Sequence, residues 1–579
     1  MILFRLSKLI LGLSLSVFPI ISHAVGACDP GEIETPASFS GVIEPATARD
    51  LNPDPDILEV YLTARPATWD FGLGNEVDVW TYNGVIPGPT LQAKVGDTLI
   101  VNFCNGLPDE STIHWHGLET PANMDGSNIS QGTVPPGGTF RYEIPLFHSG
   151  TFWYHPHFQT HRQVEKGLYG VLVVRDPDQD KALGIPEKEH IMVLDDVLID
   201  ENNQITEPFL GDKKAIALEK LNGREGNVLL VNGVSQPQMT FSRSEPHRIR
   251  MVNAANSRFM RTTLQIHDFI RIGGDQGLLE EAQVLSSIPS NNTVNQNDAV
   301  NRHLTIIPDN GVLLTPGERA DIVFNPLPYD ATFELRWHDT VRGRHDVEFL
   351  PDGTIDLTHG IRDGDNPNKI FGTVQFTGAE LKTPFVAPSP LRIIPRIDVT
   401  DAPTLPLVMG HTLPDWDTGD VKFFVQAMGM PFPMLTPDDV HTVVANRTYV
   451  WEVKNLTEGR HNFHTHGFRF QHIETEYKDL DFPDDPALNF TEPAAFIEDK
   501  DTIMLEPRPG LIRGRSFSLT RLAVNFSDSG REKQIDAFGK MPEGDESGGW
   551  LAHCHILEHS ASGMMTFFQV DDPFRNGFD

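Results

Sequence analysis

One sequence pattern occurs three times along this chain of 579 residues. The run VNFCN (101–105) precedes HWHG, and the run WEVKN (451–455) precedes HTHG. In both cases nine positions separate the asparagine from the first histidine of the following motif. In the middle of the chain, VNAAN (252–256) is followed nine positions on by QIHD, where a histidine pair would be expected. Internal repetition on this scale indicates duplicated domains.

A second motif is shared by the two ends of the chain. The segments 149–161 (SGTFWYHPHFQTH) and 547–559 (SGGWLAHCHILEH) both contain HxHxxxH, with Pro156 where the second segment has Cys554. His161 has no thiolate beside it, so we interpret it as a remnant of duplication. The ends keep histidine pairs that the middle has lost, which predicts a metal site between the first and third domains, with the second as a spacer.

Length and composition favour several all-β domains. The chain is too long for one hydrophobic core. Its 48 Gly and 44 Pro, with little helical periodicity, favour short strands joined by turns. We predict domains at about 40–180, 187–380 and 400–575, the last two joined by a Pro-rich run at 380–403. Each is expected to be a Greek-key β-sandwich or barrel.

The first residues have the features of an export signal. Two basic residues precede an apolar run (9–21) that is too short to span a bilayer, and SHA (22–24) offers a cleavage site. Residues 1–24 are therefore predicted to be a signal peptide, and the protein is expected to be exported, periplasmic or extracellular, without a membrane span. The sequence VGAC (25–28) leaves a lipid anchor on Cys28 as an alternative.

Net charge and cysteine content limit the expected binding partners and the possible disulfide bonds. The formal net charge is −34, which repels nucleic acid and anionic lipid, so neither is an expected partner. There are three cysteines. If Cys554 binds a metal, Cys28 and Cys104 can pair as a disulfide, which export permits. We expect a monomer.

Four HxH pairs carry the predicted metal chemistry. They are His114/His116, His155/His157, His464/His466 and His553/His555. Residues i and i+2 of a strand face the same side, so each pair presents two imidazoles in one direction. Imidazole suits copper or zinc, and four pairs related by a repeat outweigh the usual structural role of a single histidine.

Cys554 stands between the histidines of the last pair. Strand alternation would turn its thiolate to the face opposite these neighbours. His559 and Met564 follow at spacings that can return them to the Cys554 side, and His461 can supply a second imidazole. Two imidazoles, one thiolate and a weak axial thioether make a blue-copper electron-transfer site.

These motifs together resemble the multicopper oxidases, the family of laccases, ferroxidases and bacterial copper-efflux oxidases. The elements HWHG, HPH, HxxHxHG and HCHxxxHxxxxM occur in the family order. The resemblance implies three consecutive cupredoxin-like domains that hold four copper ions.

The resemblance also implies which residues bind each ion. The type 1 copper is expected at His461, Cys554 and His559, with Met564 axial. The type 2 copper is expected at His114 and His464. The type 3 pair is expected at His116, His155, His157, His466, His553 and His555. Electrons would leave the type 1 copper through Cys554 and reach the cluster through His553 and His555.

The implied reaction reduces O2 to two waters with four electrons that a small reducing substrate donates singly. Asp125, in HWHGLETPANMDG, matches a family acidic residue near the type 2 copper and is assigned a proton relay; a turn aspartate is the alternative. Ser560 stands where many bacterial members carry a carboxylate, which leaves that part of the relay open. Asn462 replaces a proline common in the family, with little expected chemical effect.

The substrate is less well defined. A laccase-like enzyme would take electrons from phenols or aromatic amines at an exposed ring edge of His559 or His461. An oxidase of Fe(II), Mn(II) or Cu(I) would need carboxylates at that edge, and the acidic loop 474–490 is a candidate, with a solvated surface loop as the alternative. A non-catalytic copper-binding protein is a remote alternative, because every ligand position is filled.

Overall fold

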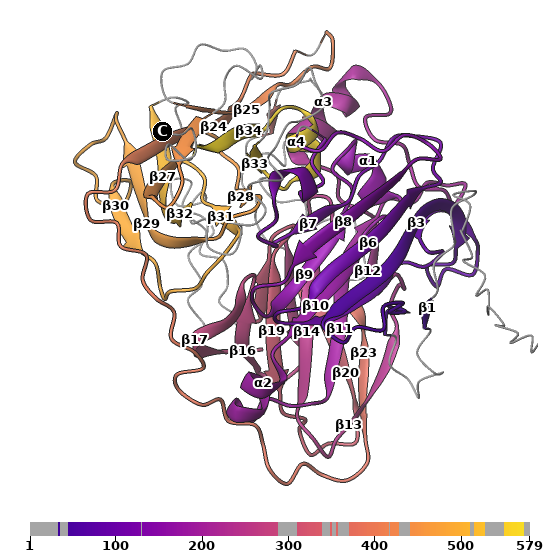
Figure 1. The fold of residues 1–579 in the computed structure, drawn as a ribbon. Coiled ribbons are helices and arrows are strands. Elements are labelled where there is room, and N and C mark those ends of the chain that lie inside the picture. The colour runs from indigo at the N-terminus through magenta and orange to yellow at the C-terminus, as the bar shows by residue number, and fades with distance from the viewer. Residues whose placement is uncertain are drawn as a thin grey trace, which may run out of the picture.

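The computed structural model describes residues 33–34, 44–128, 130–287, 310–338, 348–349, 355–356, 370–415, 417–427, 441–509, 515–526 and 549–571. The strands of these residues form three successive pairs of sheets, and the described helices are short (Figure 1). The predicted all-β class is therefore confirmed. The predicted signal peptide at 1–24 and Cys28 lie outside the described residues.

The N-terminal pair combines a six-stranded and a four-stranded sheet. The larger sheet has the order β1 (Ile33–Glu34), β2 (Thr47–Ala48), β5 (Gly88–Lys94), β10 (Gly170–Arg175), β9 (Gly150–His155), β7 (His114–His116). The smaller has the order β4 (Val77–Tyr82), β3 (Ile57–Trp69), β6 (Thr98–Asn105), β8 (Thr139–Pro145). Buried side chains such as Val60, Val101 and Leu172 fill the core between the sheets.

The middle pair combines a six-stranded and a five-stranded sheet. The larger has the order β12 (Val228–Val231), β11 (Glu189–Val197), β14 (His247–Asn253), β19 (Arg319–Phe324), β16 (Phe269–Gly274), β17 (Gly277–Leu285). The smaller has the order β13 (Gln238–Ser242), β23 (Ile370–Thr377), β20 (Thr332–His338), β15 (Met260–Leu264), β18 (Val312–Leu314). A short hairpin of β21 (Glu348–Phe349) and β22 (Ile355–Asp356) lies between β20 and β23 in the chain.

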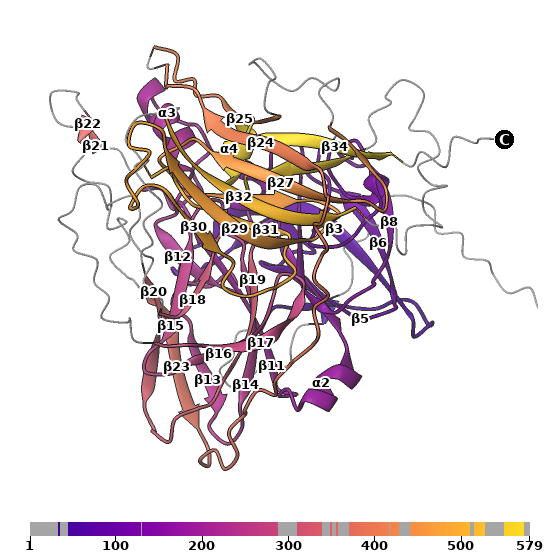
Figure 2. The same ribbon diagram turned by 90° about the vertical axis from the view of Figure 1, so that its left-hand side faces the viewer.

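The C-terminal pair has the same two sizes of sheet. Its larger sheet has the order β25 (Phe423–Ala427), β24 (Thr404–His411), β27 (Thr448–Asn455), β32 (Ser516–Asn525), β29 (Phe470–Asp479), β30 (Phe490–Pro493). The smaller has the order β26 (His441–Val444), β34 (Met565–Asp571), β33 (Trp550–His553), β28 (His461–Thr465), β31 (Thr502–Leu505). Figure 2 shows strands of the larger sheet, including β24, β27 and β32, above the strands of the middle pair.

One pairing scheme recurs in all three pairs. In one sheet of each, β3 pairs in parallel with β6, β11 with β14, and β24 with β27. In the facing sheet, β5 pairs in parallel with β10, β13 with β23, and β26 with β34. Most other ladders around these strands are antiparallel, as in β6 with β8, β14 with β19 and β27 with β32, although β2 also pairs in parallel with β5. The predicted repetition of one Greek-key unit is therefore found in the strand pairing.

Three asparagines explain the repeated sequence, but one differs from the predicted alignment. The side-chain Nδ2 of Asn105 donates to two loop carbonyls, and its Oδ1 accepts from the backbone N–H two residues on. Asn455 and Asn253 make the same three bonds. The matching residue of the middle repeat is therefore Asn253 rather than Asn256. Nine positions on from Asn253 stands Thr262 in β15, so the lost pair corresponds to Thr262 and Leu264, and not to Gln265 and His267.

The helices connect the pairs. α2 (Pro177–Leu183) follows the N-terminal pair, and α3 (Lys213–Asn222) belongs to a connection in the middle pair. α1 (Thr160–Glu165) and α3 both pack on α4 (Leu557–Ala561). No helix among the described residues has the length and apolarity needed to cross a membrane. Cys104 is disulfide-bonded and Cys554 is a buried free thiol.

Candidate metal centres

The HxH pairs lie where the N-terminal and C-terminal sheet pairs meet. β7 and β9 place His114 opposite His155, and β28 and β33 place His464 opposite His553. Figure 1 shows β7, β28 and β33 in neighbouring positions near the centre of the molecule. Two ladders from the ends of the chain thus present the same register of histidines to each other.

The local geometry differs in part from the predicted strand alternation. Only β7 contains both histidines of its pair; β9, β28 and β33 end between the two, so that His157, His466 and His555 lie just beyond a strand. One reason is chemical: Pro156 lacks an N–H and cannot extend the ladder of β9. Cys554 likewise lies in the turn between β33 and α4, and its N–H donates to the Met564 carbonyl at 3.0 Å.

The eight imidazoles form one buried cluster. The ring centroids of His114 and His466 stack at 3.7 Å, and those of His116 and His464 also stack at 3.7 Å. The other members are His155, His157, His553 and His555, all buried. Groups of three ligand atoms within 4.8 Å of one another occur at His114/His464/His466, at His114/His116/His155 and at His157/His466/His553.

The ring nitrogens fit metal ligation. In four rings one nitrogen is hydrogen-bonded to a carbonyl or carboxylate, while the other has no hydrogen-bond partner among the described residues. The free nitrogens are Nε2 of His114, His155 and His464 and Nδ1 of His116. A buried ring held from behind, with its second nitrogen free, is the usual arrangement of a metal-bound histidine.

Three further rings turn the same nitrogen toward one point. Nε2 of His553 lies 3.0 Å from Nε2 of His466 and 3.3 Å from Nε2 of His157. Such convergence of nitrogens is suited to one shared cation.

Burial disfavours the charged form of most rings in this cluster. It lowers the pKa of His116, His155, His157, His466 and His555 well below the usual value, and neighbouring imidazoles lower it further. The same two effects lower the pKa of His553 to about 3. Neutral imidazole is the form that binds a metal ion, so the cluster is ready for cations at neutral pH.

A second, smaller site lies beside the cluster. The Sγ of Cys554 is 3.7 Å from Nδ1 of His461 and 3.7 Å from Nδ1 of His559, and the two nitrogens are 3.1 Å apart. All three residues are buried, and Met564 is fully buried in the same apolar core. The Nδ1–H of His553 donates to the Cys554 carbonyl at 2.9 Å, which connects the thiol residue directly to the cluster.

The predicted exposed ring edge is not found. His461 is 0% exposed and His559 is 2% exposed. Nε2 of His559 donates to the Leu221 carbonyl in α3 at 3.0 Å, and Nε2 of His461 lies 2.8 Å from Thr457 Oγ1. The prediction was wrong because α3 comes from the middle sheet pair, and nothing in the motif around His559 reveals that this helix covers it.

Asn462 also has more contacts than predicted. Its Oδ1 accepts from the His555 N–H at 2.8 Å and lies 3.5 Å from the Cys554 Sγ. Its Nδ2 donates to the Pro316 carbonyl at 2.7 Å. Asn462 therefore links both metal-binding segments to the middle sheet pair. The proline that is common in the family could not make these contacts, because its side chain has no hydrogen-bond donor or acceptor.

Asp125 lies behind two ligand rings. Its Oδ2 accepts from His466 Nδ1 at 2.8 Å, and its backbone carbonyl accepts from His114 Nδ1 at 2.7 Å. Ser560 and Glu558 lie on α4 rather than on a strand. The Glu558 carboxylate accepts from Asn256 at 2.8 Å, and burial raises its pKa to about 7.

Sequence reasoning missed Asp501. Its Oδ1 accepts from His116 Nε2 at 3.1 Å, and its backbone carbonyl accepts from His464 Nδ1 at 2.9 Å. Burial alone would raise the pKa of this carboxyl, but the Arg319 guanidinium beside it holds the pKa well below its usual range. The sequence offers only a Lys-Asp pair before an apolar run, which is not a specific signal.

The acidic loop does not lie at the Cys554 site. Glu474 and Glu476 bond Arg521 at 2.5 and 2.9 Å, and Asp479 accepts from backbone N–H groups of its own loop. Figure 1 shows β29 and β30 well separated from α3 and α4. These carboxylates are therefore paired within their own sheet.

Two other histidines have structural partners. His161, in α1, stacks on Phe209 at 5.0 Å between ring centroids. His267 bonds the Gln265 carbonyl at 2.7 Å and accepts from the Leu327 N–H. His161 was interpreted as a remnant of duplication, and neither ring belongs to a group of convergent ligands among the described residues.

Comparison with known proteins agrees with this geometry. The family described as multicopper oxidase matches residues 63–179 and, through a second profile, residues 403–513 and 542–573. This chain belongs to the multicopper oxidase family.

Individual relatives cover different parts of the chain. Multicopper oxidase MmcO of Mycobacterium tuberculosis is 32% identical over 229 residues, 36% of this chain and 44% of that protein. Laccase-2 of Cryptococcus neoformans var. grubii is 33% identical over 219 residues, 34% of this chain and 36% of that protein. The chain thus matches less than half the length of each. A solved multicopper oxidase from Campylobacter jejuni shares the fold, with a TM-score of 0.67, 22% identity, and coverage of 93% of this chain and 98% of that one.

Proposed function

We propose that this multicopper oxidase couples four one-electron oxidations of a reducing substrate to the reduction of O2 to two waters. The observation that carries the proposal is the pair of adjoining sites, one with a thiol and two imidazoles and one with eight imidazoles, joined through Cys554 and its two histidine neighbours.

The ligand sets that we propose follow the family roles. His461, Cys554 and His559, with Met564 axial, would hold the type 1 copper, and His114 and His464 the type 2 copper. The type 3 pair would be held by His116, His155, His157, His466, His553 and His555. The free ring nitrogens and the short distances between the three Nε2 atoms support these sets. Copper bound there supplies one-electron redox chemistry, so that four electrons taken singly can reduce one O2.

The protein itself provides a route for electrons and a group for protons. The backbone of Cys554 leads directly to His553 and His555, and the bond from His553 Nδ1–H to the Cys554 carbonyl shortens the path. We assign proton relay to Asp125, since its fully buried carboxylate bonds a ring of the cluster. Four protons are consumed for each O2 reduced.

We propose a small organic reductant, a phenol or aromatic amine, as the substrate class, in line with the laccase among the relatives. An electron from this substrate would reach His559 through the peptide group of Leu221, because the Leu221 carbonyl is hydrogen-bonded to the His559 ring and covers it. The same covered ring favours a second candidate, oxidation of a metal ion such as Fe(II), Mn(II) or Cu(I) bound outside α3, because transfer through a peptide needs no contact with the ring.

Oxygen uptake by the copper-loaded protein tests the proposal. Phenol, aromatic amine, Fe(II), Mn(II) and Cu(I) are supplied in turn, and copper per chain is measured on the same sample. Four copper ions and consumption of one O2 for each four substrate molecules are expected. A loaded protein that consumes no oxygen with any donor would instead be a copper-binding protein without oxidase activity.

We also propose export, as a monomer, with cleavage after Ala24. Mass spectrometry of the mature chain distinguishes this cleavage from lipidation at Cys28, and sedimentation in solution gives the oligomeric state.

A further inference from the structure

Two carboxylates occupy equivalent positions on opposite sides of the histidine cluster. Asp125 accepts from His466 through its side chain and from His114 through its backbone carbonyl. Asp501 accepts from His116 through its side chain and from His464 through its backbone carbonyl. Each aspartate therefore fixes the first histidine of its own HxHG motif and the second histidine of the other. The arrangement is a local two-fold repeat across the joint between the sheet pairs.

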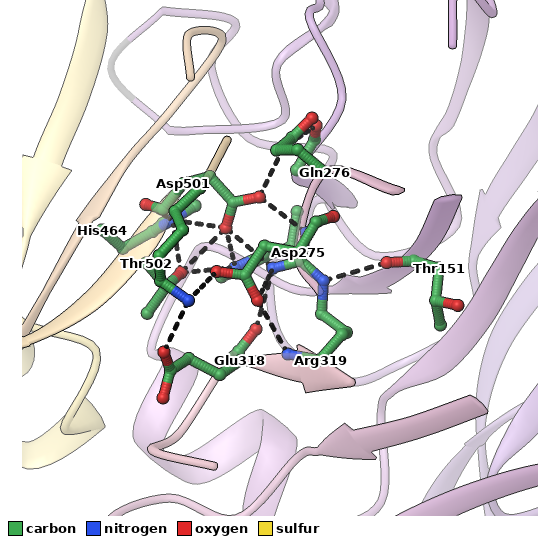
Figure 3. A network of polar contacts seen from close by, with 12 residues as sticks. Thr151, Asp275, Gln276, Glu318, Arg319, His464, Asp501 and Thr502 are labelled. Atoms are coloured by element: carbon green, nitrogen blue, oxygen red, sulfur yellow. Dashed lines mark hydrogen bonds and ion pairs between the residues drawn. The ribbon is translucent and has the colours of Figure 1, made fainter. Parts of the chain in front are cut away.

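The surroundings of the two carboxylates differ. Apart from the ligand rings, the Asp125 carboxylate accepts one bond from the described residues, from Thr120 Oγ1 at 3.4 Å. The Asp501 carboxylate accepts two bonds from the Arg319 guanidinium, at 2.7 and 2.6 Å. It also accepts from Gln276 Nε2 at 2.5 Å and from Thr502 Oγ1 at 2.8 Å. Figure 3 shows this network around Asp501.

Further hydrogen bonds fix the position of the Arg319 guanidinium. Its guanidinium donates to the carbonyls of Asp275, Thr151 and Gly317 at 2.7, 2.9 and 3.1 Å, and the side chain is fully buried. The charge of Asp275 is balanced by Lys500 at 3.0 Å. The guanidinium is thus fixed by the N-terminal and middle sheet pairs before it meets the aspartate of the C-terminal pair.

Two glycines leave the space that this contact needs. Gly117, the glycine of HWHG, has φ +91°, and a Cβ there would clash with Arg319 Nη2. Gly317 has φ +87°, and a Cβ there would lie 2.8 Å from Cε1 of His116. The backbone of the middle pair therefore packs directly against a ring of the cluster.

We propose that Arg319 and Gln276 of the middle sheet pair are positioning residues of the copper cluster, acting on His116 and His464 through Asp501. The inference rests on the proposed copper assignment. The middle pair, predicted to be a spacer, then has a direct part in the site, although it supplies no copper ligand.

The physical reason lies in the two nitrogens of an imidazole. A carboxylate that accepts from Nε2 fixes the hydrogen there and leaves Nδ1 of His116 for the metal. A bidentate guanidinium fixes the plane of that carboxylate, which a single ammonium on a flexible stem does not. Loss of such an outer partner commonly weakens metal binding about 10- to 100-fold.

The test compares two matched pairs of variants. Arg319→Lys and Asp501→Asn remove the clamp while keeping similar size. Arg248→Lys and Asp321→Asn alter another buried bidentate ion pair of the middle sheet pair, with bonds of 2.6 to 3.1 Å, that contacts no ligand of the cluster. For each protein we would measure thermal unfolding of the metal-free form, copper retained against a chelator, the blue type 1 absorption, and the type 2 electron paramagnetic resonance signal.

The expected result is selective. Arg319→Lys and Asp501→Asn keep the blue absorption but hold type 2 and type 3 copper about 10- to 100-fold more weakly. Arg248→Lys and Asp321→Asn lose stability but retain all copper. Equal copper retention by Asp501→Asn and the wild type would overturn the inference, and so would equal loss in the control pair. A wild-type protein without type 2 and type 3 signals would instead contradict the proposed function.

Discussion

The same strand–turn–helix unit is built once at each end of the molecule. In the N-terminal unit, β9 ends at His155 and α1 carries His161. In the C-terminal unit, β33 ends at His553 and α4 carries His559. Both units deliver two imidazoles to the shared cluster, but only the second continues into a metal site on its other side.

Side chains, and not the backbone frame, make this difference. The first unit has Pro156 between its histidines, and His161 stacks on Phe209. The second has Cys554, 3.7 Å from the His559 nitrogen. The second site therefore depends on the Cys554 thiol together with the imidazoles of His461 and His559, and not on a different backbone frame.

The units also share an anchor. Thr112 Oγ1 accepts from the N–H of His157 at 2.9 Å, and Asn462 Oδ1 accepts from the N–H of His555 at 2.8 Å. In each case the side chain that fixes the second histidine of the pair comes from the neighbouring strand or from just before it: Asn462 lies in β28, and Thr112 lies two residues before β7. This anchor explains why both turns keep one geometry although the residue between the histidines differs.

Replacing Cys554 by Ser removes the main difference between the units and should have the largest effect. We expect loss of the blue absorption and of oxidase activity to background, because an alcohol does not replace a thiolate as a soft copper ligand. Visible spectra and oxygen uptake measure both. Met565→Leu, a change next to Met564 at a residue outside the proposed ligand sets, is the control. Activity that survived in Cys554→Ser would disprove the electron route.

Asp125→Asn tests the half of the cluster whose carboxylate lacks an arginine clamp. We expect O2 reduction to slow about 100-fold, the usual order for loss of a general acid or base. Anaerobic reduction of the type 1 copper by substrate should stay nearly unchanged, which provides the internal control. Stopped-flow reoxidation measures the slow step, and wild-type reoxidation rates would remove Asp125 from the relay.

Asn462→Pro tests the shared anchor. The change leaves the His555 N–H and the Pro316 carbonyl without their bonds, and each buried unpaired group costs about 1–3 kcal/mol. Denaturant unfolding of the metal-free protein should therefore show a lower free energy of unfolding. Asn462→Thr, which copies the acceptor of Thr112, should recover part of the loss. Equal stability of the Pro variant and the wild type would show that the anchor is unimportant.

His161→Gln should have the smallest effect. Copper content and absorption are expected to stay unchanged, since His161 binds no metal in our assignment. Burial, with Arg224 and Arg162 nearby, lowers the pKa of His161 to about 4, whereas an unfolded chain titrates near 6.5. The unfolded state thus binds more protons between these values, and stability falls as pH falls from about 6.5 to 4.

The control for this pH dependence is the same unfolding measurement on the wild type. The slope of unfolding free energy against pH in the metal-free protein should be smaller in His161→Gln. A reduced copper content in this variant would mean that His161 contributes to a metal site, as His559 is proposed to do.

The sequence motifs identified the metal ligands but not the residues that hold those ligands in place. The four HxH pairs and Cys554 could be found because fixed spacings of a few residues carry the chemistry. Asp501 and Arg319 are 182 positions apart, and each alone is an ordinary charged residue. Their pairing depends on how the middle and C-terminal sheet pairs dock, which no local pattern records.

Two further differences have the same origin. The middle repeat was aligned on Asn256 instead of Asn253, three positions too far along, because VNAAN contains two asparagines. Only the hydrogen bonds that Asn253 donates to backbone carbonyls distinguish the two. The covered ring of His559 was missed because α3 lies more than 300 positions away in the chain. Repeats predict the units well, whereas contacts between units require the assembled molecule.

The spacing of the ligands also orders events during synthesis. Residues 114–157 provide four imidazoles, and 307 positions separate His157 from His464, where the other four begin. The complete cluster therefore exists only once the C-terminal sheet pair has been made. His114, His116 and His155 already converge within the N-terminal pair, so half of the ligands can be in place before the other half is synthesised.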